Sequence, residues 1–342
     1  MQPTGAAVLR TNTLKNGKEA RMPPKTIDVA AGVIFRADGR FLLGRRAPGS
    51  FYPGYWEFPG GKVEPEESPA EALCRELNEE LGLRVERLYP WLVRTHTYEH
   101  ARVRLHFFEV VQWQGEVRTR VHDALDWVMP ASPEMPAPML PANGPILKAL
   151  ALPRRIGITH AAAIGIEPQL AALDHALQAG LRFVLIRENA LPMPALFAKE
   201  VVRRAHAAGA LAVVNGAPEL AIEAGADGLH LTAAQLLASA SRPDFAWTGA
   251  SCHTRVELEH AAALGLDYAL LGAVKPTATH PGGKTLGWEG FKALASGLPL
   301  PVFALGGLEN ADMETARLSG AHGIAAIRGA WGGVESRYFT SS

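Results

Sequence analysis

The chain has 342 residues, enough for about two domains of ordinary size. Its 34 basic and 34 acidic residues balance, which argues against stable binding to nucleic acid or to a membrane surface. No apolar run approaches the roughly 18 residues that a membrane-spanning helix needs. The two cysteines, Cys74 and Cys252, are far apart and match no zinc or redox spacing, so the expected compartment is a reducing cytoplasm.

Residues 1–25 include basic residues but no long apolar core, and we expect a disordered tail rather than a signal peptide. Met22 is an alternative to Met1 as the natural start, because folded-looking sequence begins near Thr26. One domain is expected over residues 26–152, a second over 153–335, and a short tail over 336–342.

The first domain is expected to be α+β, with a mixed sheet and few helices. The β-like runs 27–35 and 41–44 flank Ala37-Asp38-Gly39, a hairpin signal. A loop rich in glycine, proline and aromatic residues then leads into a helix. Further strands are expected at 87–97, 103–112 and 125–129. Six prolines interrupt residues 130–145, and a short helix is expected at 146–150.

After Arg155 short apolar runs alternate with Ala-rich segments of helical spacing, such as 168–179 and 193–208. Eight runs in this rhythm predict an α/β TIM-type (β/α)8 barrel, with an open doubly wound sheet as the alternative. The expected strands are 156–159, 183–186, 211–215, 228–231, 248–251, 268–272, 302–305 and 323–327.

The most informative stretch of the first domain is a helix with two different faces. Ser68 is a good N-cap, Pro69 suits the first helical position, Glu71 completes a capping box, and Gly82 stands where helices commonly end. The apolar residues of this helix share one arc, which predicts a core-facing side. They are Ala70, Leu73, Cys74, Leu77 and Leu81.

Glu76, Glu79 and Glu80 share a second arc of the same helix. Like charges at these spacings repel by a few tenths of a kcal/mol per pair, and only Arg75 offers nearby neutralisation. A solvated charged face is one interpretation. A site for Mg²⁺ or Mn²⁺ is the other, because both ions prefer oxygen ligands. Gly60-Gly61 before the helix favours the metal site, since glycine lets backbone pass close to phosphate.

These residues resemble the signature of the Nudix hydrolases, G-x5-E-x7-R-E-U-x-E-E-x-G-U, in which U is aliphatic. Every specified position matches, and the matching residues are Gly61, Glu67, Arg75, Glu76, Leu77, Glu79, Glu80, Gly82 and Leu83. The resemblance implies a Nudix fold, with a mixed sheet between helices, and a hydrolase whose metals are bound by Glu76, Glu79, Glu80 and the Gly60 backbone. It also implies that Glu67 and Arg75 hold the loop and helix together.

Within that family, residues 27–150 look most like the MutT branch, which hydrolyses oxidised guanine nucleotides. The likeness is carried by the segments 44–47, 56–62 and 140–145. It implies that Arg46 contacts phosphate, Phe58 lines the base pocket and Asn143 reads the base edge. Lys62 is a further substrate-binding candidate. A turn residue before Gly-Pro is the alternative role of Asn143.

One position departs from the MutT pattern. A further glutamate that binds metal or acts as base is expected after the sheet, and Val121 stands in its place. His122, Asp123 and Glu99 are the candidates to replace it, and a site with fewer ligands is the remaining option.

The resemblance implies substitution at phosphorus by a metal-bound water, with Glu79 or Glu80 taking the proton of the water. The expected reaction converts 8-oxo-dGTP to 8-oxo-dGMP and pyrophosphate, an activity that serves DNA repair and mutation avoidance. The expected partner of this domain is therefore a nucleotide.

Residues 155–331 resemble the thiamine phosphate synthase and TenI group of barrels. The likeness is carried in order by the segments 213–215, 224–231, 249–253, 267–268, 276–279 and 304–307. It implies a phosphorylated thiamine-pathway ligand at the carboxyl ends of the strands. The candidate ligand-binding residues are Arg187, Asn215, Ser251, Thr277, Thr279, Lys284, Gly306 and Gly307.

The synthase pattern is altered at its charged positions. Asn189 and His280 replace two lysines, and Gly216 and Gln235 stand at two acidic positions. Without those carboxylates, metal-assisted transfer of a pyrimidine diphosphate is not expected. We expect a degenerate barrel that binds a phosphorylated ligand, performs a TenI-like isomerisation or packs on the hydrolase.

Other functions remain open at this stage. The first domain is alternatively a clean-up hydrolase for thiamine-pathway diphosphates. The barrel is alternatively a regulatory module that senses a thiamine intermediate, or a working thiamine-biosynthetic transferase.

Overall fold

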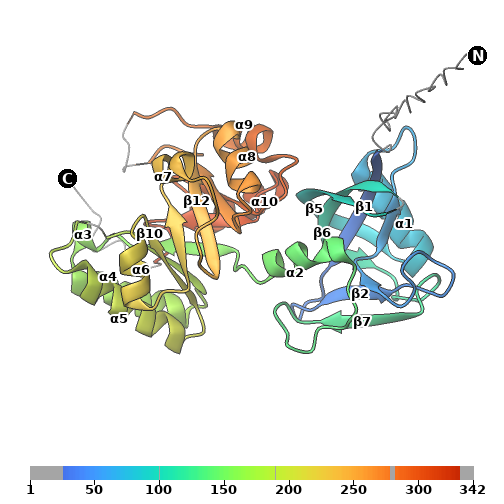
Figure 1. The fold of residues 1–342 in the computed structure, drawn as a ribbon, viewed down its shortest axis with the longest axis horizontal. Helices are drawn as coiled ribbons and strands as arrows, with labels where there is room; N and C mark the ends of the chain where they lie inside the picture. Colours follow the sequence, from blue (N-terminus) through green and yellow to red (C-terminus); the bar gives the residue numbers. More distant parts are fainter. Residues whose placement is uncertain (1–25, 100, 189, 278–281, 332–342) are drawn as a thin grey trace, which may run out of the picture.

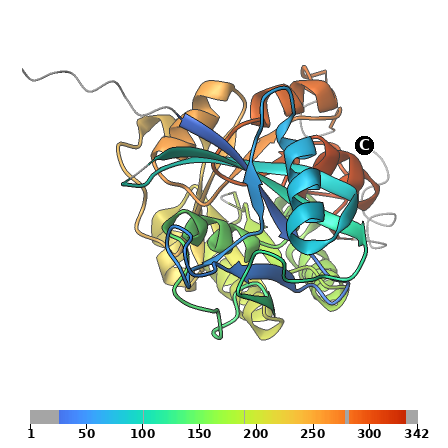
Figure 2. The same cartoon turned by 90° about the vertical axis from the view of Figure 1, so that its right-hand side faces the viewer.

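The computed structural model describes residues 26–99, 101–188, 190–277 and 282–331, in two domains that follow one another along the chain (Figure 1). The predicted tails, 1–25 and 336–342, lie outside the described residues, as does Met22. Within the described ranges, every helix is too short or too polar to cross a lipid bilayer. Figure 2 views the molecule from the N-terminal domain, with the barrel behind it.

The N-terminal domain contains a four-stranded mixed sheet, as predicted, and a second, three-stranded antiparallel sheet that was not predicted. The larger sheet consists, in spatial order, of β4 (Gly60–Lys62), β1 (Thr26–Ile34), β6 (Arg102–Gln114) and β5 (Arg84–Thr97). The smaller sheet consists of β3 (Trp56–Glu57), β2 (Phe41–Arg45) and β7 (Ala124–Val128).

The turn at residues 36–40 lies where it was predicted, but it does not join a two-stranded hairpin. The Gly39 amide donates to the Arg36 carbonyl at 3.0 Å, and a single bridge links Phe35 to Phe41. Beyond that bridge β1 and β2 diverge into different sheets. Burial of both strands against different partners outweighs the local pairing that the turn favours.

Alternation along β1 builds two cores. Ala30 and Ile34 pack with helix α1 (Pro69–Leu81), whereas Ala31 and Val33 pack with α2 (Gly144–Leu150). The four-stranded sheet therefore has a helix on each side, because successive side chains of a strand point to opposite faces. The short 3-10 helix η1 (Pro141–Asn143) leads into α2.

The C-terminal domain is a closed barrel of eight parallel strands, which confirms the predicted fold and excludes the open sheet. Its strands are β8 (Arg155–Ile158), β9 (Phe183–Ile186), β10 (Leu211–Asn215), β11 (Gly228–Leu231), β12 (Trp247–Cys252), β13 (Tyr268–Gly272), β14 (Val302–Leu305) and β15 (Gly323–Ala326). The helices between them are α3 (Ala161–Ile164), α4 (Ile166–Gln178), α5 (Pro194–Ala207), α6 (Pro218–Ala224), α7 (Ala233–Ala238), α8 (Arg255–Ala263), α9 (Gly287–Ala295) and α10 (Met313–Leu318), with the 3-10 helix η2 (Asn310–Asp312) before the last.

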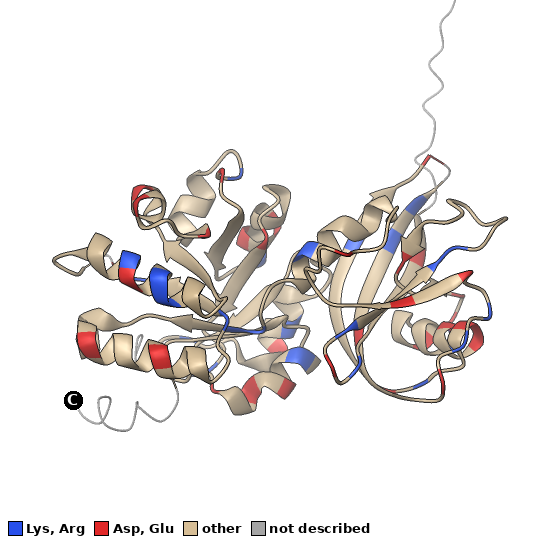
Figure 3. Cartoon of the chain, turned by 90° about the horizontal axis from the view of Figure 1, so that it is seen from below, with Lys and Arg blue, Asp and Glu red and all other residues tan. Residues whose placement is uncertain are grey.

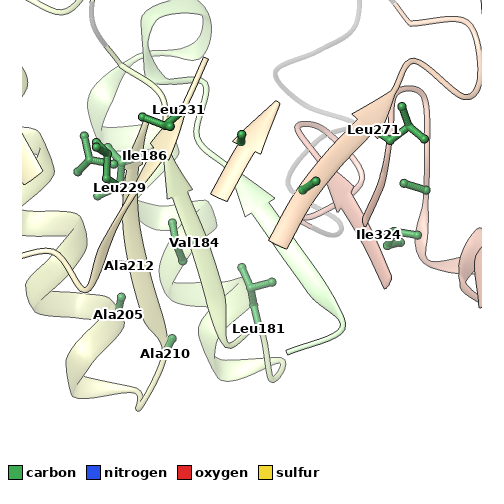
Figure 4. Packing of buried hydrophobic residues seen from close by; sticks show 14 of the residues in the cluster. Leu181, Val184, Ile186, Ala205, Ala210, Ala212, Leu229, Leu231, Leu271 and Ile324 are labelled. Atoms are coloured by element: carbon green, nitrogen blue, oxygen red, sulfur yellow. The ribbon is translucent and has the colours of Figure 1, made fainter. Parts of the chain in front are cut away.

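The barrel strands alternate between an interior and an outer core. Phe183 and Leu185 fill the interior together with Phe303. Val184 and Ile186 lie in the layer between strands and helices (Figure 4). Because both faces of each strand are buried, the barrel strands are continuous apolar runs in the sequence.

Candidate active site

The helix that carries the glutamates has the predicted limits. The Ser68 hydroxyl accepts from the Glu71 amide at 3.3 Å, and the Glu71 carboxylate accepts from the Ser68 amide at 2.8 Å. The helix ends at Gly82, whose φ of 72° is left-handed and suits glycine. Leu73 and Leu77 are buried under the helix. Glu76 and Glu80 are half-buried and Glu79 is exposed, and acidic positions recur along the helix (Figure 3).

Arg75 ties this helix to the loop before it. Its guanidinium donates to both carboxylate oxygens of Glu67, at 2.8 and 3.2 Å, and to the Lys62 carbonyl at 3.1 Å. It also forms ion pairs with Glu76 at 3.1 Å and Glu79 at 3.3 Å. The hydrogen bonds from Arg75, followed by that from the Glu64 amide, lower the pKa of Glu67. This geometry supports the predicted positioning role of Arg75 and Glu67.

Glu80 is the glutamate in the most unfavourable electrostatic position. Burial raises its pKa to about 7, and repulsion from Glu76 and Glu57 adds to the effect, while His122 and a hydrogen bond from the Gly60 backbone oppose it. Its Oε2 atom is buried without a hydrogen-bond partner. A carboxylate in this setting is stabilised by a cation placed against it.

Oxygen donors around Glu80 fit a hard divalent cation. Within the described part of the chain no three His, Cys, Asp or Glu side chains already converge on a metal position, since Arg75 holds Glu76 and Glu79. The three carboxylates and the Gly60 carbonyl nevertheless form the oxygen-only set that Mg²⁺ and Mn²⁺ prefer. Gly61 passes so close that a Cβ there would lie 2.1 Å from the Glu76 carboxyl carbon.

A cavity of about 850 Å³ opens beside this group. Its charged and polar lining residues include Arg46, Lys62, Glu57, Glu80 and His122. Its aromatic lining residues are Phe51, Tyr52 and Tyr98, of which the two tyrosine rings lie 5.5 Å apart. The remaining lining residues are Ile27, Val29, Ala47, Pro48, Gly49, Ser50, Gly60, Gly61, Ala101, Val103, Leu105, Val121 and Leu140. The cavity therefore combines charged groups with apolar and aromatic surface.

Arg46 and Lys62 line the cavity, where the sequence placed them as substrate-binding residues. Arg46 pairs with Glu57 and donates to the Phe51 carbonyl at 2.6 Å. Both cations line the same cavity as Glu80. This placement suits contacts to phosphate oxygens.

The structure does not bring Phe58 or Asn143 to the cavity. Phe58 is 4% exposed and packs between Phe41 and Phe107, each ring centroid 5.7 Å away. Asn143 is also 4% exposed, and its amide lies 3.8 Å from the sulfur of Met139. Neither belongs to the lining of the cavity, because both side chains turn into the core. The predicted base contacts of these two residues have no counterpart in this geometry.

The structure distinguishes among the candidates to replace the glutamate that was expected at the position of Val121. Val121 lines the cavity but brings no ligand atom, Asp123 is paired with Arg45 at 2.6 Å, and the exposed Glu99 lies outside the lining. His122 is buried in the cavity wall, with an unpartnered Nδ1 and with Nε2 3.6 Å from the Glu57 carboxylate. Glu57 itself was not selected from the sequence. Its position in the strand just before Gly60-Gly61 is the signal that could have indicated it.

A smaller cavity, of about 270 Å³, lies at the carboxyl ends of β13, β14 and β15 in the barrel. Thr277, Gly306 and Gly307 line it, together with Arg328. Arg187, Asn215 and Ser251 follow or end other strands at the same rim but are outside this lining, and Lys284 is exposed. Thr279, Asn189 and His280 lie outside the described residues.

Gln235, which differs from the synthase pattern, and His230, which lies in a segment that resembles it, both have structural roles here. Gln235 caps α7, since its amide oxygen accepts from the Thr232 amide at 3.0 Å, and its Nε2 donates to the Gly216 carbonyl at 2.9 Å. His230 is fully buried and joins Tyr268 at 3.1 Å to Ser251 at 3.0 Å. Burial lowers the pKa of His230 to about 3, so the imidazole is neutral.

Comparison with known proteins matches both domains separately. A family model described as "NUDIX domain" matches residues 25–150, and one described as "Thiamine monophosphate synthase" matches residues 156–330. A CTP pyrophosphohydrolase of Escherichia coli is 41% identical over 127 residues, which are 36% of this chain and 91% of that protein. An 8-oxo-dGTP diphosphatase of Proteus vulgaris is 38% identical over 96 residues, 28% of this chain and 86% of that protein.

The barrel has relatives of its own. A putative thiamine-phosphate synthase of Geobacter sulfurreducens is 35% identical over 164 residues, which are 46% of this chain and 77% of that protein. The chain therefore belongs to two families, being a Nudix hydrolase in its N-terminal domain and a member of the thiamine monophosphate synthase family in its barrel.

Proposed function

We propose that the N-terminal domain hydrolyses a nucleoside triphosphate to the monophosphate and pyrophosphate, with 8-oxo-dGTP as its preferred substrate. The observation that carries the proposal is the unpartnered carboxylate of Glu80, with its raised pKa, in the same cavity as Arg46 and Lys62. The Proteus relative named for 8-oxo-dGTP supports the oxidised guanine nucleotide. The E. coli relative named for CTP makes CTP the second candidate.

The chain's own residues supply the positioning for this reaction. A divalent cation bound by Glu76, Glu79, Glu80 and the Gly60 carbonyl would neutralise phosphate charge and acidify water. Arg46 and Lys62 bind the triphosphate oxygens. The water oxygen forms a bond to phosphorus while the bond to the departing pyrophosphate breaks. The proton of the water passes to the Glu80 carboxylate, and charged contacts orient the groups that react.

The aromatic side of the cavity suits the nucleoside. Tyr52 and Tyr98 present rings to the cavity, and Leu140 adds an apolar surface. Flat heterocyclic bases are held by such surfaces through stacking and apolar burial.

The test is release of pyrophosphate from 8-oxo-dGTP, dGTP and CTP, and of orthophosphate from thiamine diphosphate, with and without Mg²⁺, by the wild type and by Glu80→Gln. We expect Mg²⁺-dependent turnover of 8-oxo-dGTP well above that of dGTP, and its loss in the variant. Asp123→Asn, which removes an exposed carboxylate paired with Arg45, is the matched control and should keep wild-type turnover. If CTP or thiamine diphosphate is turned over faster than 8-oxo-dGTP, that compound becomes the proposed substrate instead. Full activity of Glu80→Gln would contradict the assigned role.

For the barrel we propose binding of a phosphorylated thiamine-pathway ligand without synthesis of thiamine phosphate. The supporting observation is the cavity of Thr277, Gly306, Gly307 and Arg328, together with Gln235 in a capping role at a position that the synthase pattern gives to an acid. Thermal unfolding of the full chain with thiamine phosphate tests the binding, since a ligand of the native state raises stability. Formation of thiamine phosphate from its two precursors would overturn the second half of the proposal.

A further inference from the structure

Among the described residues, the hydrogen bonds and ion pairs that join the two domains all involve one end of the barrel. The barrel residues that contact the hydrolase domain precede strands β8, β12, β13, β14 and β15 or lie on α10. Each side contributes several groups. On the barrel they are Leu152, Arg154, Ala246, Asp267, Leu298, Pro299, Glu314, Arg317 and His322, and on the hydrolase they are Arg87, Tyr89, Trp91, Val93, Arg94, Glu109 and Lys148. This surface is called the junction below.

A buried ion-pair group lies at the centre of the junction. Glu109 of β6 is 2% exposed, and its two carboxylate oxygens accept from different barrel cations, Arg154 and Arg317. Arg317 also lies over the ring of Tyr89, 3.9 Å from its centroid. Tyr89 stands opposite Glu109 in the β5–β6 pairing, and its hydroxyl donates to Glu314 at 2.5 Å. Removal of one member of such a group leaves the charge of its partners buried and uncompensated.

A neutral histidine completes the centre of the junction. His322 is fully buried, its Nε2 donates to the Leu152 carbonyl at 3.0 Å, and its Nδ1 accepts from the Trp91 indole at 3.1 Å. This pattern requires the neutral ring with its proton on Nε2. Trp91 is 7% exposed and belongs to the core of the hydrolase domain, so its indole links that core directly to the barrel.

Backbone bonds at the rim fix the orientation of the domains. The Val93 amide of β5 donates to the Leu298 carbonyl at 3.0 Å, and Arg94 donates to the Pro299 carbonyl at 2.7 Å. Lys148 of α2 pairs with Asp267 at 2.6 Å on another side. Inter-domain contacts with few buried groups permit motion, whereas buried charges and interlocked backbone oppose it.

From this geometry we propose that the junction, at the end of the barrel where its strands begin, is a permanent interface with the hydrolase domain. The two domains then unfold as one cooperative unit. The same geometry separates the two cavities. Asp267, Pro299 and His322 of the junction precede β13, β14 and β15, whereas the barrel cavity follows the same three strands. Strands of this length hold the cavity about 13–17 Å from the junction.

Hydrogen exchange of the full chain tests the cooperative unit. Ile34→Val removes one methylene from a fully buried site of the hydrolase core. It should accelerate the slowest amides of β1 about 2- to 10-fold, and a single unit requires the same factor for the slowest amides of β9–β11. Val201→Ala, in the outer core of the barrel, is the reverse experiment, because it perturbs the barrel and should accelerate the slowest amides of β1 by the same factor as those of β9–β11. Barrel amides that keep the wild-type rate in Ile34→Val, or β1 amides that do so in Val201→Ala, overturn the proposal.

Glu109→Gln tests the assigned cause. When the charge of Glu109 is removed, Ile34→Val should accelerate the exchange of barrel amides less than the exchange of hydrolase amides. Glu66→Gln, an exposed carboxylate before the catalytic helix, is the matched control and should leave the two responses equal. Equal responses in the Glu109→Gln background would remove the ion-pair group from the explanation, and separate thermal transitions in the wild type would refute the single unit itself.

Discussion

Replacement of Gly61 by alanine is the sharpest test of the catalytic helix, because the structure gives its effect directly. A Cβ at Gly61 would lie 2.1 Å from both the carboxyl carbon and Oε1 of Glu76. Ordinary van der Waals contact begins near 3.4 Å, so the carboxylate has to move by more than about 1 Å. Gly61 has no positive φ, and the atoms that must move end a flexible side chain. The substitution should therefore displace a proposed metal ligand while the fold survives.

A misplacement of about 1 Å at a reacting centre costs on the order of 100-fold in rate, close to 3 kcal/mol. We expect kcat of Gly61→Ala to fall by that factor, with the free energy of unfolding changed by less than about 1 kcal/mol. Steady-state kinetics measure kcat, and urea unfolding measures the free energy of unfolding. A Mn²⁺ titration reports whether the proposed metal ligand has been displaced. Gly290→Ala, inside α9 and in ordinary contact at 3.4 Å, is the control and should keep full activity. A folded Gly61→Ala protein with wild-type rate would refute the reasoning.

Other substitutions have equally defined outcomes. Arg75→Lys keeps the charge but loses the two-pronged contact with Glu67, so kcat should fall about 10-fold or more, as steady-state assays would show, with thermal unfolding nearly unchanged. Without metal, Glu80 opposes folding above its ordinary pKa of 4.5, because its folded pKa is about 7 and the unfolded chain gives up the proton first. Glu80→Gln should therefore be more stable in EDTA by roughly 1–3 kcal/mol at pH 8 and should show no gain at pH 4 in urea unfolding. Burial and then the nearby Arg154 hold the pKa of His322 well below 6.5. The free energy of unfolding should therefore fall as the pH drops below about 6.5, and urea unfolding should show a smaller dependence on pH for His322→Gln. Arg328→Ala, which changes a lining residue of the barrel cavity, should weaken the thermal shift that thiamine phosphate produces, whereas an unchanged shift would place the ligand outside that cavity.

The catalytic helix could be predicted in detail because its determinants are local. The capping box of Ser68 and Glu71, the terminal Gly82 and the apolar arc all act within one helix, and each has the predicted role in the structure. The barrel was predictable for a related reason. Strands such as β9, which are buried on both faces, leave continuous apolar runs that recur between helices.

The cavity and the junction depend on long-range packing, which local patterns do not encode. Glu57 reaches the cavity because β3 pairs with β2, whereas the neighbouring Phe58 turns into the core with Phe41 and Phe107. One step along the chain thus exchanges a cavity residue for a core residue. Glu109 lies in an apolar strand, and its partners Arg154 and Arg317 come from a different domain. Nothing near Glu109 in sequence indicates that it is paired.

The two Gly-Gly pairs show why residue type alone does not identify a phosphate site. At Gly61 a Cβ would collide with a carboxylate of the proposed active site. At Gly306 it would lie 2.7 Å from the Cα of Ala273, and at Gly307 2.3 Å from the Pro276 carbonyl. Backbone packing against the preceding loop therefore already requires the barrel glycines, and packing against the Ala30 carbonyl requires Gly60 in the same way, whereas the three atoms nearest to a Cβ at Gly61 all belong to the Glu76 carboxylate. Only Gly61 therefore supports the proposed chemistry, and the barrel's phosphate ligand has to be established by binding.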